Sequence, residues 1–334
     1  LTSNIKNMDD AVNLINNVLN GGANDINTLS ILADFIGDLE SSANITTSPC
    51  PLCSGHGTCQ DEVCICFAGW TLPDCSMSEA TFNKVIDAKK NILNDLSNSG
   101  NQDPDIVLKS AEKLSDPRFN TNETGAILDK ILDKTLLGDP NAKLNEEQVS
   151  SATTILDNII SISSNTDCDG TDPLTKELQK KTESYLTAIS SNTLNSKLPN
   201  DEPVVLSKEN FDMYLTRITY CQLLNQQLGT TEDAPRVDLQ AKKDDSIPCD
   251  QIYDVEFYAF SDSLYNCGSK FANSSKTSIS IKIKDPSNGE NVENLFTMSI
   301  EMPKDKPCMS GCKKNPSNKC KCEDLSIFDL KNQM

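Results

Sequence analysis

The strongest constraint on this chain is a dense cluster of cysteines between residues 50 and 75. The chain has 14 cysteines, and the cluster contains six of them, namely Cys50, Cys53, Cys59, Cys64, Cys66 and Cys75. A segment this short cannot bury enough apolar surface to fold by packing alone, so covalent cross-links must stabilise it. Dense local cysteines are typical of disulfides formed in an oxidising compartment. We therefore expect an extracellular or cell-surface protein of the secretory pathway, with all cysteines in disulfides.

Zinc sites in a cytosolic protein are the alternative explanation of these cysteines. Structural zinc sites usually repeat C-x2-C pairs, because two pairs supply the four ligands of a tetrahedral ion. Only Cys50 and Cys53 have that spacing within the cluster, and no second pair completes a site. The chain has a single His, His56, which disfavours His-rich metal sites and Ser–His or Cys–His catalysis. The sequence shows no phosphate-binding loop either, so we expect no metal, no cofactor and no enzyme activity.

The order of the clustered cysteines is C-x2-C-x5-C-x4-C-x-C-x8-C, and Gly69 and Trp70 lie inside the last interval. This pattern resembles an EGF-like module of the short kind found in tenascins and other adhesion proteins. The resemblance implies that the first cysteine pairs with the third, the second with the fourth and the fifth with the sixth. These pairs are Cys50–Cys59, Cys53–Cys64 and Cys66–Cys75. Sequence alone leaves other pairings open.

Two segments have some features of calcium sites. Calcium-binding EGF modules carry an acidic lead before the first cysteine, whereas this chain has Thr47, Ser48 and Pro49 there. Residues 165–170 resemble the start of an EF-hand loop, but Lys176 occupies the position that requires a bidentate Glu. We therefore expect no calcium at either place.

Amphipathic helices are predicted on both sides of the cysteine cluster. Apolar residues recur at helical spacing within residues 9–19, 26–39, 76–96, 103–117, 124–137, 145–160 and 172–189. Each stripe covers one face of its helix, so the helices are expected to pack on one another in a bundle. The EGF-like module is then expected to protrude from this bundle as an insertion that can be removed without unfolding it.

The hydrophobic period changes from helical spacing to two after about residue 203. Apolar side chains alternate with polar ones in residues 211–215, 253–259, 279–283 and 296–302. Residues 286–289 read Pro-Ser-Asn-Gly and can turn the chain between the last two segments. The pattern predicts an antiparallel β-sandwich.

The end of the chain carries a second cysteine motif. Residues 308–328 read CMSGCKKNPSNKCKCEDLSIF, which resembles a GPS motif, the final strands of a GAIN domain in polycystin-type (REJ) proteins and adhesion receptors. Those families place a helical subdomain before a β-sandwich. The resemblance implies the pairs Cys308–Cys320 and Cys312–Cys322. The remaining four cysteines are then expected to pair as Cys168–Cys221 and Cys249–Cys267.

GPS motifs commonly cleave themselves, and the matching bond here joins Leu325 to Ser326. The acyl shift needs a base to take the hydroxyl proton of the nucleophile. Asp324 stands where the family has His, and a solvated carboxylate is a weak base at neutral pH. The sequence also lacks the usual Trp residues between the first two cysteines of the motif. We therefore predict that this bond stays intact and that the chain has no catalytic residue.

The charge balance excludes one class of partner. The chain has 334 residues, with 30 Lys+Arg against 49 Asp+Glu and a net charge of −19, so it repels phosphate backbones and nucleic acid is not an expected partner.

No apolar run is long enough to cross a bilayer, and a membrane span is expected beyond Met334. Sequons at Asn44, Asn122 and Asn273 predict N-glycosylation and agree with secretion.

These observations predict an α+β multidomain chain. The expected domains are a helical segment at 1–48, the EGF-like module at 49–76, a helical subdomain at 77–195 and a GAIN-like β-sandwich at 196–334. The expected function is non-enzymatic: adhesion, assembly or force-bearing support next to a membrane, as a segment of a large cell-surface protein. The Asn- and Ser-rich composition points to a ciliary surface. The alternative is a secreted structural protein that polymerises into a coat or fibre. Expected partners are other extracellular or cell-surface proteins, in a homo- or hetero-assembly.

Overall fold

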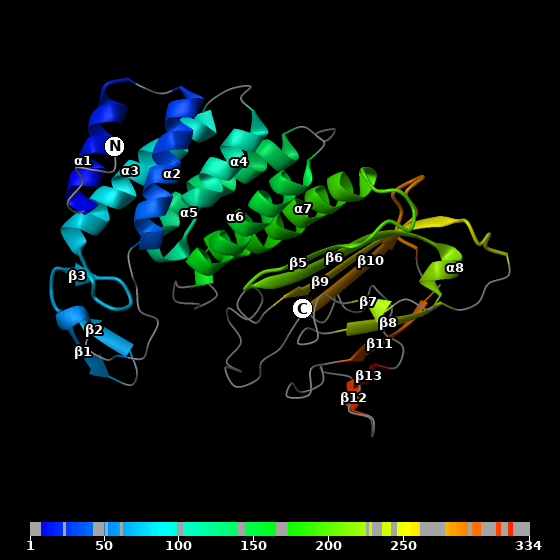
Figure 1. Ribbon diagram of the computed structural model, residues 1–334. Helices are drawn as coiled ribbons and strands as arrows, with labels where there is room; N and C mark the ends of the chain where they lie inside the picture. The colour runs from blue at the N-terminus through cyan, green and yellow to red at the C-terminus, as the bar shows by residue number, and fades with distance from the viewer. Residues whose placement is uncertain are drawn as a thin grey trace. The chain divides into compact units, whose positions relative to one another are not determined.

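The computed structural model describes fifteen stretches of the chain. They are residues 8–22, 25–42, 50, 53–60, 63–98, 103–138, 144–164, 173–224, 227–228, 236–241, 246–260, 278–292, 296–301, 312–314 and 320–322. Helices and antiparallel sheets form two compact units (Figure 1). The first unit comprises residues 1–139 and 151–163, and the second comprises residues 140–150 and 164–334. The predicted domain boundaries stay predictions.

The first unit is mainly helical, as the apolar spacing predicts. Its helices are α1 (Met8–Asn20), α2 (Ile26–Ser42), α3 (Glu79–Asn98), α4 (Pro104–Lys113), α5 (Asn122–Leu132) and most of α6 (Glu146–Ser164). Short helical turns η3 (Pro117–Phe119) and η4 (Asp133–Leu137) follow α4 and α5. The stripes of apolar residues form the core, and its buried members include Ile15, Leu29, Ile36, Ile92, Leu93, Leu96, Leu108, Leu128 and Leu156.

The helix ends follow local sequence signals. The Asp103 side chain accepts a hydrogen bond from the Asp105 backbone N–H, and Pro104 begins α4. Thr121 and Thr124 form a reciprocal capping box at the start of α5. These caps satisfy backbone N–H groups that a helix leaves without partners at its first turn.

The cysteine-rich module folds into two small two-stranded sheets. A short turn, η2 (Cys53–Gly55), precedes β1 (Gly57–Gln60), which pairs with β2 (Val63–Cys66). The strands β3 (Trp70–Thr71) and β4 (Met77–Ser78) form the second pair, and β4 runs directly into α3.

The second half of the module packs against helical elements of the first unit, and whether the module can be removed without unfolding them stays a prediction. Leu72 and Met77 lie in one buried cluster with Phe119 of η3, and Phe82 of α3 packs against it. The Glu79 backbone N–H also donates to the Gly69 carbonyl over 2.9 Å. The second half of the module is therefore part of the core of the first unit. The sequence pattern did not show this, because Phe119 lies outside any periodic apolar stripe.

The second unit contains two antiparallel sheets. The four-stranded sheet has the order β10 (Ser278–Lys284), β9 (Ile252–Phe260), β6 (Phe211–Thr219) and β5 (Val204–Ser207). The other has the order β12 (Cys312–Lys314), β13 (Cys320–Cys322), β11 (Phe296–Glu301), β8 (Arg236–Ala241) and β7 (Gln227–Leu228). The four segments with apolar alternation thus lie in β6, β9, β10 and β11, which confirms their prediction as strands.

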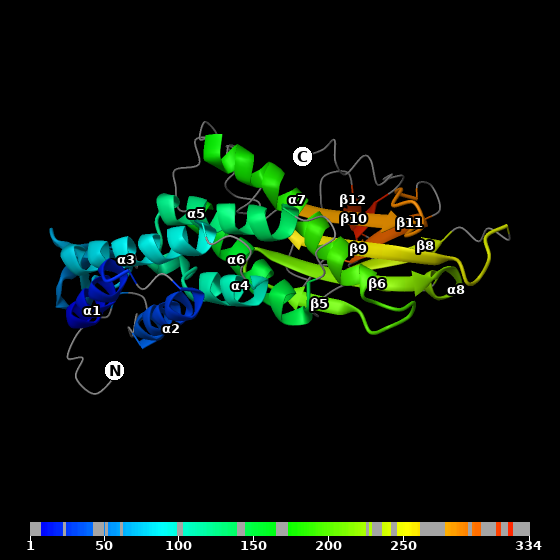
Figure 2. The same cartoon turned by 90° about the horizontal axis from the view of Figure 1, so that it is seen from above.

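Both faces of the four-stranded sheet are covered. One face carries an apolar cluster that includes Tyr253, Val255, Phe257, Ile281 and Ile283. Helix α7 (Pro173–Asn195) lies over the other face (Figure 2), where its Ser190 and Thr187 bond to Tyr258 and Lys282 of the sheet. Every residue of β9 after Ile252 is therefore buried, including the polar ones.

Candidate interaction surface

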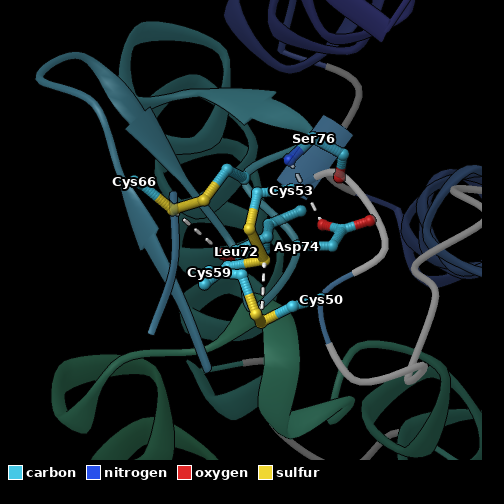
Figure 3. The surroundings of a disulfide bond; sticks show 9 residues. Cys50, Cys53, Cys59, Cys66, Leu72, Asp74 and Ser76 are labelled. Atoms are coloured by element: carbon cyan, nitrogen blue, oxygen red, sulfur yellow. Dashed lines mark hydrogen bonds between the residues drawn. A yellow bond between two sulfur atoms is a disulfide. The ribbon is translucent and has the colours of Figure 1, made fainter. Parts of the chain in front are cut away.

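Three disulfides hold the small module together (Figure 3). They join Cys50 to Cys59, Cys53 to Cys64 and Cys66 to Cys75, with Cα–Cα distances of 5.3, 5.6 and 5.3 Å. This is the order that the resemblance to EGF-like modules implies. The sulfur atoms of Cys50, Cys53 and Cys64 lie within 4.8 Å of one another, a spacing that metal ligands also show. Each of these sulfurs belongs to a disulfide, however, so none is a thiolate that could bind an ion.

A fourth disulfide joins Cys221 to Cys249. The predicted pairs Cys168–Cys221 and Cys249–Cys267 are therefore wrong. The fold brings the two residues together because α8 (Tyr220–Leu223) lies against the segment before β9. The Tyr220 and Cys221 N–H groups donate to the Gln251 and Cys249 carbonyls at 2.8 and 3.3 Å.

The other predicted cysteine pairs involve the segments around Cys168, Cys267 and the last four cysteines. Cys168, Cys267 and Cys308 lie outside the described residues. Cys312 and Cys322 are directly opposite each other in the β12–β13 register. Their pairing and that of Cys308 with Cys320 stay predictions.

Strand β2 presents an unusual distribution of side chains. Its cysteines, Cys64 and Cys66, are half-buried and join the interior of the module. The alternate residues Val63 and Ile65 of β2 and Phe67, which directly follows the strand, are 63%, 50% and 53% exposed. Successive side chains of a strand point to opposite faces, and the bond from the Phe67 N–H to the His56 carbonyl continues the pairing past Cys66, so these three share one face, hereafter the β2 apolar face. Disulfides fill the interior of so small a module and leave these side chains no core to enter.

The residues beside the β2 apolar face are polar or aromatic. In the β1–β2 register Gln60 is opposite Val63 and Thr58 is opposite Ile65, and both of these β1 residues are exposed. The His56 ring is stacked on Trp70, with centroids 3.3 Å apart and planes 5° apart. The His56 side chain is partly exposed.

A buried polar cluster in the second unit contains residue types that enzymes use. The Tyr258 hydroxyl lies 3.2 Å from Glu256 Oε2 and hydrogen-bonds to the Ser190 hydroxyl, while Lys284 pairs with Glu256 Oε1. Ser190, Glu256 and Tyr258 are 0%, 1% and 2% exposed, so a substrate has no access to them. Burial also raises the pKa of Tyr258 well above its usual value, which keeps the phenol protonated. We interpret this cluster as the polar contact between α7 and the sheet.

The first unit has a buried ion pair that the sequence did not reveal. Lys89 of α3 donates to Glu40 Oε1 of α2 at 2.8 Å and to the Phe119 carbonyl at 2.9 Å. Lys89 is 0% exposed and Glu40 is 2% exposed, and no described residue hydrogen-bonds to Glu40 Oε2. Both residues lie on the buried side of an amphipathic helix. A charged side chain of such a helix is normally expected on the opposite side, which faces solvent.

The remaining predicted sites are only partly described. Asn122 is exposed at the first position of α5, where a glycan would meet solvent. Asn44, Asn273, Leu325 and Ser326 lie outside the described residues. Within the stretches that the structure describes, no helix has the length and apolar character needed to cross a bilayer.

Comparison with known proteins identifies one part of the chain. Residues 50–78 match the family of teneurin-like EGF domains. No curated protein matches the chain significantly. The match confirms the EGF-like module, and its end at residue 78 includes β4, which pairs with Trp70 and Thr71. A teneurin-like EGF domain held by disulfides indicates an extracellular protein of the adhesion type.

Proposed function

We propose that this chain is a non-enzymatic extracellular segment of a larger cell-surface protein and that it acts in adhesion or assembly through its EGF-like module. The observation that carries the proposal is the β2 apolar face, which exposes three large apolar side chains on a disulfide-bonded ribbon. A surface that is already rigid loses little conformational entropy when it binds, so such a ribbon is well suited to contact another protein.

The proposal includes a GAIN-like β-region close to a membrane, with the ciliary surface as its location. The helices α1–α7 precede the strands β5–β13 along the chain, and a β12–β13 hairpin with opposed cysteines lies near its end. These features support the proposal. The proposal also holds that the Leu325–Ser326 bond stays intact, because Asp324 is a poor base. Denaturing electrophoresis should show one chain across this bond, and Asp324→His should increase cleavage.

An attachment assay tests the adhesion proposal. Beads coated with the purified chain are mixed with cultured ciliated cells and, separately, with one another. We expect the coated beads to attach to the cells, and beads coated with reduced and alkylated chain to lose this attachment. The alkylated chain is the control, because it keeps the amino-acid sequence and lacks the disulfides, both those of the ribbon and Cys221–Cys249. Attachment that is equal before and after alkylation, or absent in both, would show that the module is not an adhesive element.

The same preparation tests the alternative function. A secreted protein that polymerises into a coat or fibre should form sedimenting assemblies as its concentration rises, visible as filaments by negative-stain electron microscopy. If filaments form and cells do not attach, the polymerising coat replaces the adhesion proposal.

A further inference from the structure

We propose that the β2 apolar face is a docking site for an extended segment of another protein whose apolar side chains alternate with lysine or arginine. This inference rests on the proposed function and names the chemical class of its partner. Three observations carry it: the concentration of apolar side chains on one strand, the free edge of that strand, and the charge of the module.

The concentration of apolar side chains is local. The described residues include seven large apolar side chains that are exposed, namely Ile31, Val63, Ile65, Phe67, Leu137, Leu198 and Val205. Single exposed apolar residues are normal on soluble proteins and need no explanation. Val63, Ile65 and Phe67, in contrast, occupy alternate positions of one five-residue stretch, so their side chains form a continuous stripe. An exposed apolar stripe of this kind is a candidate binding site.

The edge of β2 indicates the shape of the partner. The β1–β2 sheet has two strands, so among the described residues no further strand pairs with the outer edge of β2. An extended segment can add to such an edge through main-chain hydrogen bonds and lay its alternate side chains along the same face. The ribbon is already ordered before such a segment binds. Disulfides fix Cys64 and Cys66, and the Phe67 N–H donates to the His56 carbonyl at 2.7 Å.

The charge of the module indicates the sign of the partner's charge. The sequence from residue 50 to 78 contains Asp61, Glu62 and Asp74 and no Lys or Arg, and of these three Asp74 is buried. Asp61 and Glu62 directly precede Val63 in the chain. With a net charge of −19 the chain repels a second copy of itself, whereas a basic segment is attracted. The apolar side chains of such a segment would cover the stripe, and its cationic side chains would be attracted by the negative charge of the chain.

Fluorescence anisotropy with a labelled peptide tests the inference. The probe is a short peptide of alternating isoleucine and lysine, and the control peptide has glutamate in place of lysine. We expect the lysine peptide to bind the full chain and to bind more weakly as salt is added, because screening weakens charge attraction. The glutamate peptide should not bind. Equal binding of both peptides would overturn the charge argument.

Variants test the location of the site. Ile65→Ser combined with Phe67→Ser should weaken binding of the lysine peptide by about tenfold or more. A few large side chains that become buried in an interface carry most of its binding energy. Leu198→Ser is the matched control, because it removes an exposed apolar side chain elsewhere (69% exposed) and should leave binding unchanged. Alkylation without reductant, followed by mass measurement, shows whether the disulfides of each variant are intact. A second variant, Asp61→Asn with Glu62→Gln, should reduce both affinity and salt dependence.

The outcomes separate this inference from the proposed function. If wild-type beads attach to cells and the Ile65→Ser, Phe67→Ser variant attaches and binds peptide equally well, the docking site is wrong and the adhesive function stands. If wild-type beads fail to attach, the proposed function is wrong whatever the peptide does. Two further results would overturn the inference: self-association that the double variant abolishes, and binding to phosphatidylcholine vesicles in preference to the peptide.

Discussion

Lys89 is a buried ammonium group whose partners come from two other segments, Glu40 of α2 and the Phe119 carbonyl of η3. Replacing it by methionine keeps most of the volume but leaves the Glu40 carboxylate buried without a cation. We expect Lys89→Met to lower the free energy of unfolding by about 3–5 kcal/mol, the usual cost of breaking a buried pair. Urea unfolding followed by circular dichroism measures this. The double variant Lys89→Met, Glu40→Leu should recover much of the loss, and no recovery would contradict this account.

Glu40 also predicts a pH dependence. Burial raises the pKa of this carboxyl from 4.5 to about 7, since no described residue hydrogen-bonds to its Oε2 atom and the attraction of Lys89 offsets only part of the desolvation. Nearby Asp116 raises the same pKa further, while Arg118 lowers it. Between these two pH values the folded chain holds more protons at Glu40 than the unfolded chain does. The contribution of Glu40 to stability is therefore present in full below pH 4.5 and is lost as the pH rises through about 7.

The measurement is the free energy of unfolding of the wild type minus that of Glu40→Gln, taken at several pH values. Glutamine has the same shape and does not titrate, so this difference isolates the carboxyl group. We expect the difference to fall as the pH rises from 4.5 to about 7. A constant difference over this window would show that Glu40 titrates normally in the fold.

Gly57 sits where the module has no room for a side chain. A Cβ atom there would lie 2.7 Å from Cys75 Sγ and 2.7 Å from the Ile65 carbonyl oxygen. Gly57→Ala should therefore destabilise the module by about 1–3 kcal/mol, the usual cost of overpacking, and lower the yield of correctly paired disulfides. Disulfide mapping after oxidative refolding checks this. Gly125→Ala is the control, because its nearest contact, Ile162 Cγ2, is at 3.4 Å and it should refold normally.

At the scale of elements, one hydroxyl group contributes to the contact of α7 with the four-stranded sheet. The Tyr258 hydroxyl shares a hydrogen bond with Ser190 of α7, and the Leu186 carbonyl at 3.3 Å and Glu256 Oε2 at 3.2 Å are alternative acceptors for its single proton. Tyr258→Phe removes these hydrogen bonds and takes one donor away from the buried Glu256 carboxylate. We expect a loss of about 1–3 kcal/mol. The loss should be smaller when Ser190→Ala is already present, because the two side chains share a bond, and strict additivity of the two variants would contradict the coupling.

Elements with strong periodicity could be predicted from the sequence, and their surroundings could not. The apolar residues of β9 alternate as Tyr253, Val255, Phe257 and Ala259, so the strand and its apolar face follow directly. Nothing in that pattern shows that α7 buries the polar face as well, because burial there depends on hydrogen bonds from a helix distant in sequence. The Cys221–Cys249 bond was missed for a similar reason: backbone contacts between α8 and the segment before β9 bring its cysteines together.

The candidate site was predictable only in its covalent part. Cysteine spacing and the family resemblance gave the three disulfides of the module. In the stretch Val63-Cys-Ile-Cys-Phe67, however, both alternating sets are apolar, so the sequence does not say which set faces inward. The disulfides decide this, because sulfur atoms that bond across the module must point into it. The positions of the cysteines therefore indicate that Val63, Ile65 and Phe67 are the exposed set.

At the scale of the whole molecule, the remaining question is whether the module and the bundle of the first unit fold together. Deleting residues 50–75 and joining the ends through a Gly/Ser linker removes Leu72 and the strand β3 that pairs with β4. Phe119, which is 0% exposed, would then lose part of its cover, and α3 would lose the Gly69 carbonyl that accepts from the Glu79 N–H. We expect the deletion to destabilise the first unit by several kcal/mol, about the cost of truncating a buried large side chain.

Hydrogen exchange read residue by residue tests this prediction. Amide protection should fall in α3 and η3, with β9 of the second unit as the internal reference. Leu72→Ser is the point variant that removes one side chain of the buried cluster, and it should reproduce part of the effect. Val63→Ser is its matched control, since Val63 belongs to the same module but is 63% exposed, and its protection pattern should equal that of the wild type. Unchanged protection of α3 in the deletion variant would show that the helical bundle folds without the module, because its helices alone would then bury enough apolar surface to hold α3 in place.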